Sequence, residues 1–127
     1  MTASTWDRLA DCLPPGCSLE RTEDHARLHV AIATETIILD ARIREWGETR
    51  WLWLGGLVGP ARHVEPASLV AENATRIIGT FEVTREGDVW LRHTLLVDES
   101  SSELATVVAE LVSELRTRRL SMPSNKT

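Results

Sequence analysis

Residues 80–120 carry the clearest structural pattern of the chain, and they read TFEVTREGDVWLRHTLLVDESSSELATVVAELVSELRTRRL. Phe81 and Val83 alternate with polar residues over 80–84, Val89 and Leu91 lie two residues apart in 88–97, and a three-residue loop ending in Gly87 joins the two stretches. A loop of this length with glycine in the left-handed position is a common hairpin connection. It sets two apolar pairs opposite each other on one face: Phe81 with Leu91, and Val83 with Val89. The pattern therefore predicts a β-hairpin with one buried face.

A long amphipathic helix is predicted to follow this hairpin. Ser100 and Glu103 have the spacing of a capping box, in which the two side chains satisfy amides of the first turn. The arginines of the segment lie near its end, where the helix dipole favours positive charge. Apolar residues recur at helical spacing along one stripe: Leu104, Val107, Val108, Leu111, Val112 and Leu115.

Upstream of residue 80, the sequence predicts two shorter helices and three strands. Residues 20–24 are polar and are predicted to be a loop or an irregular strand start. The second helix is expected to begin at Pro66, to end at Gly79 and to bury one stripe: Leu69, Val70, Ala74 and Ile77. The other predicted elements are a helix over 6–13 that Pro14-Pro15-Gly16 ends, and strands over 27–32, 37–44 and 50–58, the last bent or ended by Gly55-Gly56.

The predicted element order is α-β-β-β-α-β-β-α. Because strands follow one another instead of alternating with helices, we expect an α+β fold with an antiparallel sheet of about five strands and helices packed on one face. A chain of 127 residues is long enough for one core. We expect a single domain over 1–120 and a polar C-terminal tail over 121–127.

The pairing of the first two strands depends on the turn between them. If Thr34-Glu35 is a two-residue turn, Val30 lies opposite Leu39, Ile32 opposite Ile37, and His29 faces Asp40. Neither turn residue suits the geometry of such a turn, so a longer loop with a shifted register is the alternative.

Composition and charge restrict the class of partner and the compartment. A net charge of -5 disfavours a surface that follows nucleic-acid phosphates. The longest apolar run, residues 51–58, is far shorter than a membrane helix, and the N-terminus lacks the pattern of a signal peptide. We therefore expect a cytoplasmic protein with reduced Cys12 and Cys17, and no membrane insertion.

Residues that could support catalysis or metal binding do not form a recognised site in the sequence. Opposite His29, Asp40 could complete a hydrogen-bonded cross-strand pair or a catalytic relay, but no nucleophile motif accompanies it. His63 and His93 stand alone, and the two cysteines lack the spacing of a zinc site. The glycine run at 55–60 lacks the lysine of a phosphate loop. We predict no catalytic residue, no metal and no cofactor.

The tryptophans are the most informative candidates for a binding role. Trp51 and Trp53 point to one face of the predicted third strand, and the leucines between them point to the other. One layer of helices cannot bury both faces, so one pair must face the first helix, a dimer partner or a client protein; burial in the core stays an alternative. The candidate partner-binding residues are Trp6, Leu9, Trp46, Trp51 and Trp53.

The second half of the chain resembles YbjN-type members of the type III secretion chaperone-like fold. The resemblance covers 69–120, including a helix ending near Asn73 and a G-x-V-x-x-R-x-x-L pattern in the final hairpin: Gly87, Val89, Arg92 and Leu95. It implies a small acidic homodimer that binds peptides or proteins and is not an enzyme.

The sequence analysis therefore predicts a secretion-chaperone-like or regulatory protein that holds an apolar segment of a client protein. One alternative is an immunity-type or antitoxin-like inhibitor of a partner protein. The other is a small enzyme or small-molecule sensor that uses His29 and Asp40.

Overall fold

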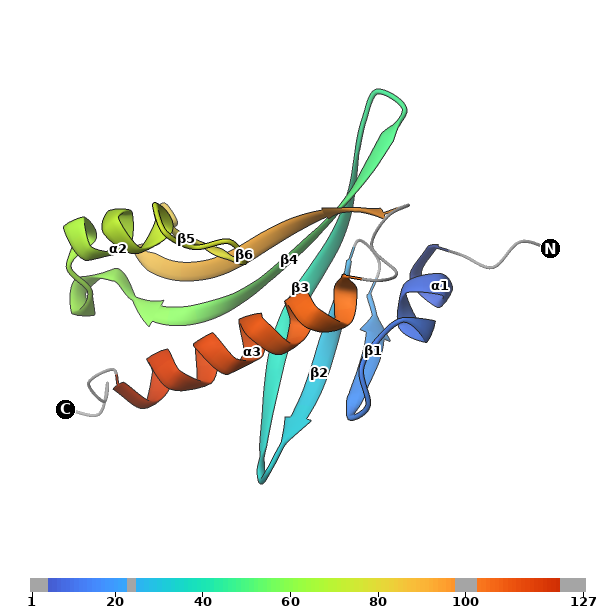
Figure 1. Cartoon of the computed structure of the whole chain (residues 1–127), viewed down its shortest axis with the longest axis horizontal. Helices are drawn as coiled ribbons and strands as arrows, with labels where there is room; N and C mark the ends of the chain where they lie inside the picture. The colour runs from blue at the N-terminus through green and yellow to red at the C-terminus, as the bar shows by residue number, and fades with distance from the viewer. Residues whose placement is uncertain (1–4, 23–24, 98–102, 122–127) are drawn as a thin grey trace.

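A computed structural model describes residues 5–22, 25–97 and 103–121, and within these the chain forms a six-stranded antiparallel sheet and three α-helices (Figure 1). The strand order is β1-β2-β3-β4-β6-β5. The elements are α1 (Thr5–Asp11), β1 (Cys17–Arg21), β2 (Ala26–Ile32), β3 (Glu35–Trp46), β4 (Thr49–Pro60), the 3-10 turn η1 (Ala61–His63), α2 (Pro66–Asn73), β5 (Thr80–Val83), β6 (Asp88–Leu96) and α3 (Leu104–Ser121). This arrangement confirms the predicted α+β class, with one strand more than expected.

The predicted hairpin and helix form the centre of the core. Phe81 pairs with Leu91 and Val83 with Val89, as expected, although Val83 is exposed at the strand end. The whole predicted stripe of α3 is buried against the inner face, by which we mean the face that α1 and α3 cover. The predicted capping box includes Ser100, which lies outside the described residues.

The additional strand, β1, occupies residues that the sequence analysis left partly unassigned. It pairs with β2 over its whole length and directs Cys17 and Leu19 inward. As a short edge strand it leaves Ser18 and Glu20 exposed, so it lacks the apolar run that marks a buried strand. The prediction of a loop over 20–24 is wrong for residues 20 and 21.

The predicted register between β2 and β3 is wrong by two residues. Val30 pairs with Ile37, and His29 pairs with Ile38 instead of Asp40. The turn is Ala33-Thr34, and Ala33 adopts the left-handed conformation with φ 53°. A shift of two residues keeps every side chain on its predicted face, so the apolar pattern alone could not distinguish the two registers.

Strand β4 continues through Gly55-Gly56, so the predicted alternative that the strand ends at this pair is wrong. The register shift in β4 comes later, between Leu57 and Gly59. The two glycines instead provide space on opposite faces. A Cβ atom on Gly56 would clash with Leu115 of α3, and one on Gly55 would lie 2.8 Å from the Trp53 indole. Gly56 therefore lets α3 approach the inner face closely.

The sheet divides at the end of the β3–β4 pairing. The last pair is Asp40 with Gly55; beyond it β3 continues beside β2, while β4 continues beside β6. The C-terminal part of α3 contacts both halves. Arg119 Nε donates a hydrogen bond to the Leu57 carbonyl at 3.0 Å, and Arg116 Nε lies 3.0 Å from Glu35 Oε2. These contacts connect the two halves of the sheet through one helix.

Helix α2 is shorter than predicted, and the predicted stripe is wrong beyond Leu69. The helix ends at Asn73, Val70 is exposed, and Ile77 is 93% exposed in the segment after the helix. The Asn73 side chain instead contacts edge strand β5: its Nδ2 donates to the Phe81 carbonyl at 3.0 Å, and its Oδ1 accepts from the Phe81 amide at 2.8 Å. This side-chain amide takes the place of a neighbouring strand at that edge.

Candidate protein-binding surface

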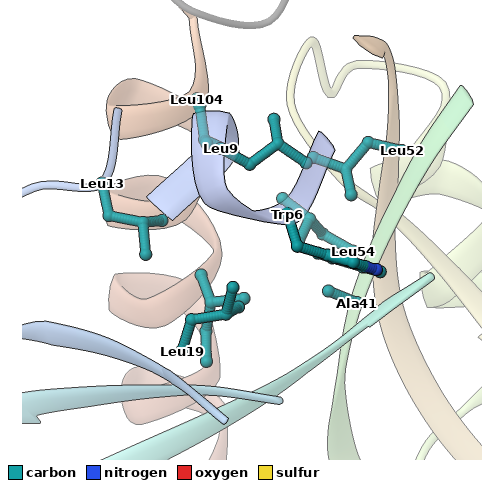
Figure 2. A pocket seen from close by; sticks show the side chains of 9 residues that line it. Trp6, Leu9, Leu13, Leu19, Ala41, Leu52, Leu54 and Leu104 are labelled. Atoms are coloured by element: carbon teal, nitrogen blue, oxygen red, sulfur yellow. The ribbon is translucent and has the colours of Figure 1, made fainter. Parts of the chain in front are cut away.

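The predicted binding residues on the first helix are directed into the protein. Trp6 and Leu9 project from α1 onto the inner face, toward Leu52 and Leu54 of β4 (Figure 2). Leu9 is buried and Trp6 partly so, and the cavity that they line with their neighbours measures only about 10 Å³. Arg50 Nη1 donates to the Thr5 hydroxyl at 2.6 Å and connects the start of α1 to the sheet. A cavity of this size holds no more than about one water molecule, so it has no room for a client side chain.

The predicted tryptophans on β4 lie on the opposite, outer face of the sheet. Trp51 is 37% exposed, and Trp53 is partly buried beside Trp90 of β6, with the ring centroids 6.4 Å apart. Leu57, on the same face of β4 and 40% exposed, pairs with Trp90. We call Trp51, Trp53, Leu57 and Trp90 the tryptophan strip. It forms an apolar band along β4 that none of the three described helices covers.

Gly55 determines how Trp53 lies within the tryptophan strip. The ring atoms of Trp53 occupy the space where a side chain at residue 55 would begin. The indole therefore lies over the backbone of its own strand instead of standing away from the sheet. This position brings the Trp53 ring beside the ring of Trp90.

Arginines flank the tryptophan strip on the β3 side. Arg42 pairs across the strands with Trp53, and Arg44 with Trp51, and both arginines are exposed. Two other arginines of the outer face have carboxylate partners: Arg27 lies 3.7 Å from Asp40, and Arg92 lies 2.6 Å from Glu82. The His29 ring lies 3.3 Å from Glu20. Within the described part of the chain, Arg42 and Arg44 have no carboxylate partner.

Trp46 lies apart from the strip, at the end of the long β3–β4 hairpin. It pairs with Thr49 beside the turn and is 84% exposed. The hairpin projects well beyond the rest of the sheet (Figure 1). Trp46 is therefore accessible to a partner that contacts both the hairpin tip and the outer face.

The predicted His29–Asp40 pair does not form. His29 Nε2 lies near Glu20 of β1, while Asp40 lies opposite Arg27 and forms an ion pair with it. The two-residue shift in register separates the groups that a relay would need to bring together. Among the described residues, moreover, no three His, Cys, Asp or Glu side chains are grouped so that they could hold a metal ion.

His93 has a structural role at the junction of α2, β5 and β6. Its Nδ1 accepts a hydrogen bond from the Gly79 amide at 3.0 Å, so the neutral ring carries its proton on Nε2. Burial lowers the pKa of His93 below its ordinary value, and the nearby Glu103 carboxylate partly opposes this effect. Protonation of Nδ1 would remove the acceptor and break the bond to Gly79.

This hydrogen bond predicts a pH-dependent loss of stability. Because the pKa of His93 is lower in the folded chain, the unfolded chain takes up the proton first as the pH falls below about 6.5. The stability that the neutral His93 ring contributes is therefore fully present above that pH and decreases below it. We expect the urea midpoint to fall less between pH 7 and pH 5 in His93→Asn, whose amide oxygen accepts without titrating; an equal fall in both proteins would contradict this role.

The sequence pattern indicates Trp51 and Trp53 as surface candidates but not the rest of this surface. Trp90 alternates with buried Val89 and Leu91, so its outward position could have been read from the hairpin. Arg42 and Arg44 appear in the sequence as ordinary exposed residues of a strand. Only the pairing of β3 with β4 places them beside the tryptophans.

The comparisons with known proteins bear on the fold. Among solved structures, the chain is similar to a chain of the HopA1–SchA chaperone–effector complex, with a TM-score of 0.61 and 16% identity over 91% of this chain and 93% of that one. The two chains share a fold. The predicted chaperone-like architecture is thus supported, with a six-stranded sheet. No protein-family model and no curated protein matches the chain, so the YbjN-type resemblance stays a prediction.

In the described part of the chain, no helix combines the length and the apolar character needed to cross a membrane.

Proposed function

We propose that this chain is a non-enzymatic, cytoplasmic chaperone or regulator that holds an apolar segment of a client protein on its tryptophan strip. The observation that carries the proposal is the one-sided packing of the sheet. Helices α1 and α3 bury the inner face, whereas the outer face presents large aromatic side chains in one band. Tryptophans of this kind supply a large contact area at low entropic cost, and they dominate the binding energy of many protein interfaces.

The fold supports a role in binding. The similar solved chain comes from a chaperone–effector complex, and this chain spans nearly all of it. Fold alone does not determine function, so the proposal depends on the tryptophan strip, and the likeness supports only the class of role.

We propose that a second copy of the chain binds at the α2–β5 edge, giving a homodimer whose two tryptophan strips stay free. Val70 on α2, Ile77 after it and Val83 on β5 are all exposed apolar side chains on neighbouring elements. Exposed apolar side chains beside a short edge strand are typical of a surface that another chain covers.

The test is isolation of the chain with its partner from the cells that produce it, followed by reconstitution of the complex from the two purified proteins. We expect Trp51→Ser and Trp53→Ser each to weaken the reconstituted complex about tenfold or more, measured by calorimetry. Ser113→Ala, at an exposed position on α3, is the matched control and should leave the affinity unchanged.

Trp6→Ser distinguishes the two predicted capture sites. If it abolishes binding while the strip variants bind normally, the client binds beneath α1 and the strip proposal is wrong. Circular dichroism of each variant shows whether the fold is retained. A partner that proves to be a toxin inhibited by the complex would favour the immunity-type role over the chaperone role.

A further inference from the structure

We propose that the segment held on the tryptophan strip is an amphipathic helix with carboxylates along one flank. This inference rests on the proposed function and adds the conformation and the charge of the client segment. Two features of the outer face carry it. The strip offers side chains but no free strand edge to a client backbone, and Arg42 and Arg44, which have no carboxylate partner among the described residues, lie along only one side of it.

The position of the strip favours a helix over an extended peptide. An extended segment needs a strand edge to satisfy its backbone amides and carbonyls, but from Trp51 to Gly55 the strip lies on the face of β4 between β3 and β6. Beyond Gly55, where β4 has left β3, the Leu57 carbonyl already accepts a hydrogen bond from Arg119. A helix satisfies its own backbone, and helices commonly cover the apolar face of a sheet. From Trp51 to Leu57 the strip extends roughly 20 Å. A helix of about 13 residues would span that length.

The charges beside the strip favour a client with carboxylates. Arg42 and Arg44 are two residues apart on β3, and their Cα atoms are therefore separated by roughly 7 Å. Residues four apart on a helix are separated by about 6 Å along its axis, so two glutamates at this spacing can reach both arginines. A guanidinium binds a carboxylate through two parallel hydrogen bonds, which fixes the orientation of the helix on the strip.

The same charges argue against a second copy of the chain and against nucleic acid as the occupant. On the outer face, Asp40 and Glu82 lie within ion-pair distance of Arg27 and Arg92, and Glu20 Oε2 lies 3.3 Å from His29 Nε2. A second outer face would therefore bring no free carboxylate to Arg42 and Arg44. Two unpaired arginines on a chain with a net charge of -5 are too few to follow a phosphate backbone.

The test uses three synthetic helical peptides of about 18 residues that share one leucine and phenylalanine stripe. They differ only at two flank positions four residues apart, which carry glutamate, glutamine or lysine. We expect fluorescence anisotropy to show the glutamate peptide binding about tenfold more tightly than the lysine peptide. The double variant Arg42→Glu/Arg44→Glu should reverse this order, and Trp51→Ser should weaken all three peptides.

The double variant Arg8→Glu/Arg85→Glu is the matched control, because it makes the same change in net charge at exposed positions away from the outer face. It should keep the preference for the glutamate peptide. Equal affinities for the glutamate and lysine peptides, or no binding of any peptide, would overturn the inference. A 20-nucleotide single strand that binds more tightly than the glutamate peptide, or self-association that Trp51→Ser abolishes, would also overturn it.

Failure of this inference can be distinguished from failure of the proposed function. If the natural partner needs Trp51 and Trp53 but is indifferent to the charges of Arg42 and Arg44, the function stands and the acidic helix is wrong. If the partner binds normally to the Trp51 and Trp53 variants, the strip itself is not the binding site.

Discussion

Replacement of Gly56 by alanine is expected to destabilise the fold by about 1–3 kcal/mol, although alanine suits a strand better than glycine does. The added methyl group would clash with the buried side chain of Leu115 and would also lie 3.1 Å from Leu39 Cδ2. Leu115 is fully buried, so it has little room to move away. Urea unfolding of the purified proteins measures the effect.

Leu115→Ala, combined with Gly56→Ala, tests whether the two residues are in direct contact. Alone it should cost about 2–5 kcal/mol, because it leaves a cavity beneath α3. In the double variant Gly56→Ala/Leu115→Ala, the new methyl group enters part of that cavity. The combined loss should therefore be smaller than the sum of the single losses, by about 1 kcal/mol or more.

Gly55→Ala is the matched control for this cycle. It changes the neighbouring residue of the same strand, but on the outer face, where the Trp53 ring can move toward solvent. We expect a change in stability below about 1 kcal/mol, together with a shift in tryptophan fluorescence as Trp53 leaves Trp90. If the losses of stability in Gly56→Ala/Leu115→Ala are strictly additive, Gly56 is not the contact point of α3.

Replacement of Asn73 by aspartate is expected to destabilise the chain by roughly 2–4 kcal/mol at pH 7, because two backbone groups lose their partner or face a repulsive one. The Asn73 amide donates to the Phe81 carbonyl and accepts from the Phe81 amide. A carboxylate can still accept, but it cannot donate, and its charge lies against the carbonyl oxygen. Urea unfolding at pH 7 measures the loss.

The pH dependence of Asn73→Asp separates this explanation from a general loss of packing. A protonated carboxyl group again has one donor and one acceptor, so the difference from the wild type should narrow as the pH falls toward about 4. Thr75→Ala is the control, since its hydroxyl bonds only to the nearby Glu72 carbonyl, and it should cost less than about 1 kcal/mol. A constant difference at all pH values would exclude the paired hydrogen bonds as the cause.

The contacts of Gly56 and Asn73 both lie away from the outer face of the sheet. Gly56 brings α3 close to the inner face, and Asn73 occupies the exposed edge of β5 where another strand could pair. Both contacts therefore stabilise the fold without covering the outer face. The proposed function needs this division, because a surface that holds a client must stay uncovered without weakening the fold.

Much of the architecture could be predicted from local sequence patterns. The hairpin of β5 and β6 was predictable because its alternation and the Gly87 turn specify the same register. The buried stripe of α3 was predictable because helical spacing brings its six apolar residues to one side. Edge strand β1 was not predictable, since it depends on pairing with β2. The early end of α2 was not predictable either, since it depends on the contact between Asn73 and Phe81.

The candidate site could be predicted only in part. The alternation of tryptophan and leucine in β4 indicated that Trp51 and Trp53 share a face. It could not indicate which face the helices cover, because apolar residues lie on both. The position of Trp90 and the arginines beside the strip required the strand order β3-β4-β6 and its register.

Local sequence patterns specify the class of the fold, the final hairpin and helix, and which side chains share a face in the strands that they predict, because these follow from residues a few positions apart. The β2–β3 register, the roles of Gly55 and Gly56, and the grouping of Trp51, Trp53, Leu57 and Trp90 beside Arg42 and Arg44 depend on the three-dimensional arrangement of the chain. The physical reason is that a shift of two residues, or a change of neighbouring strand, leaves every local pattern unchanged while it changes which side chains meet.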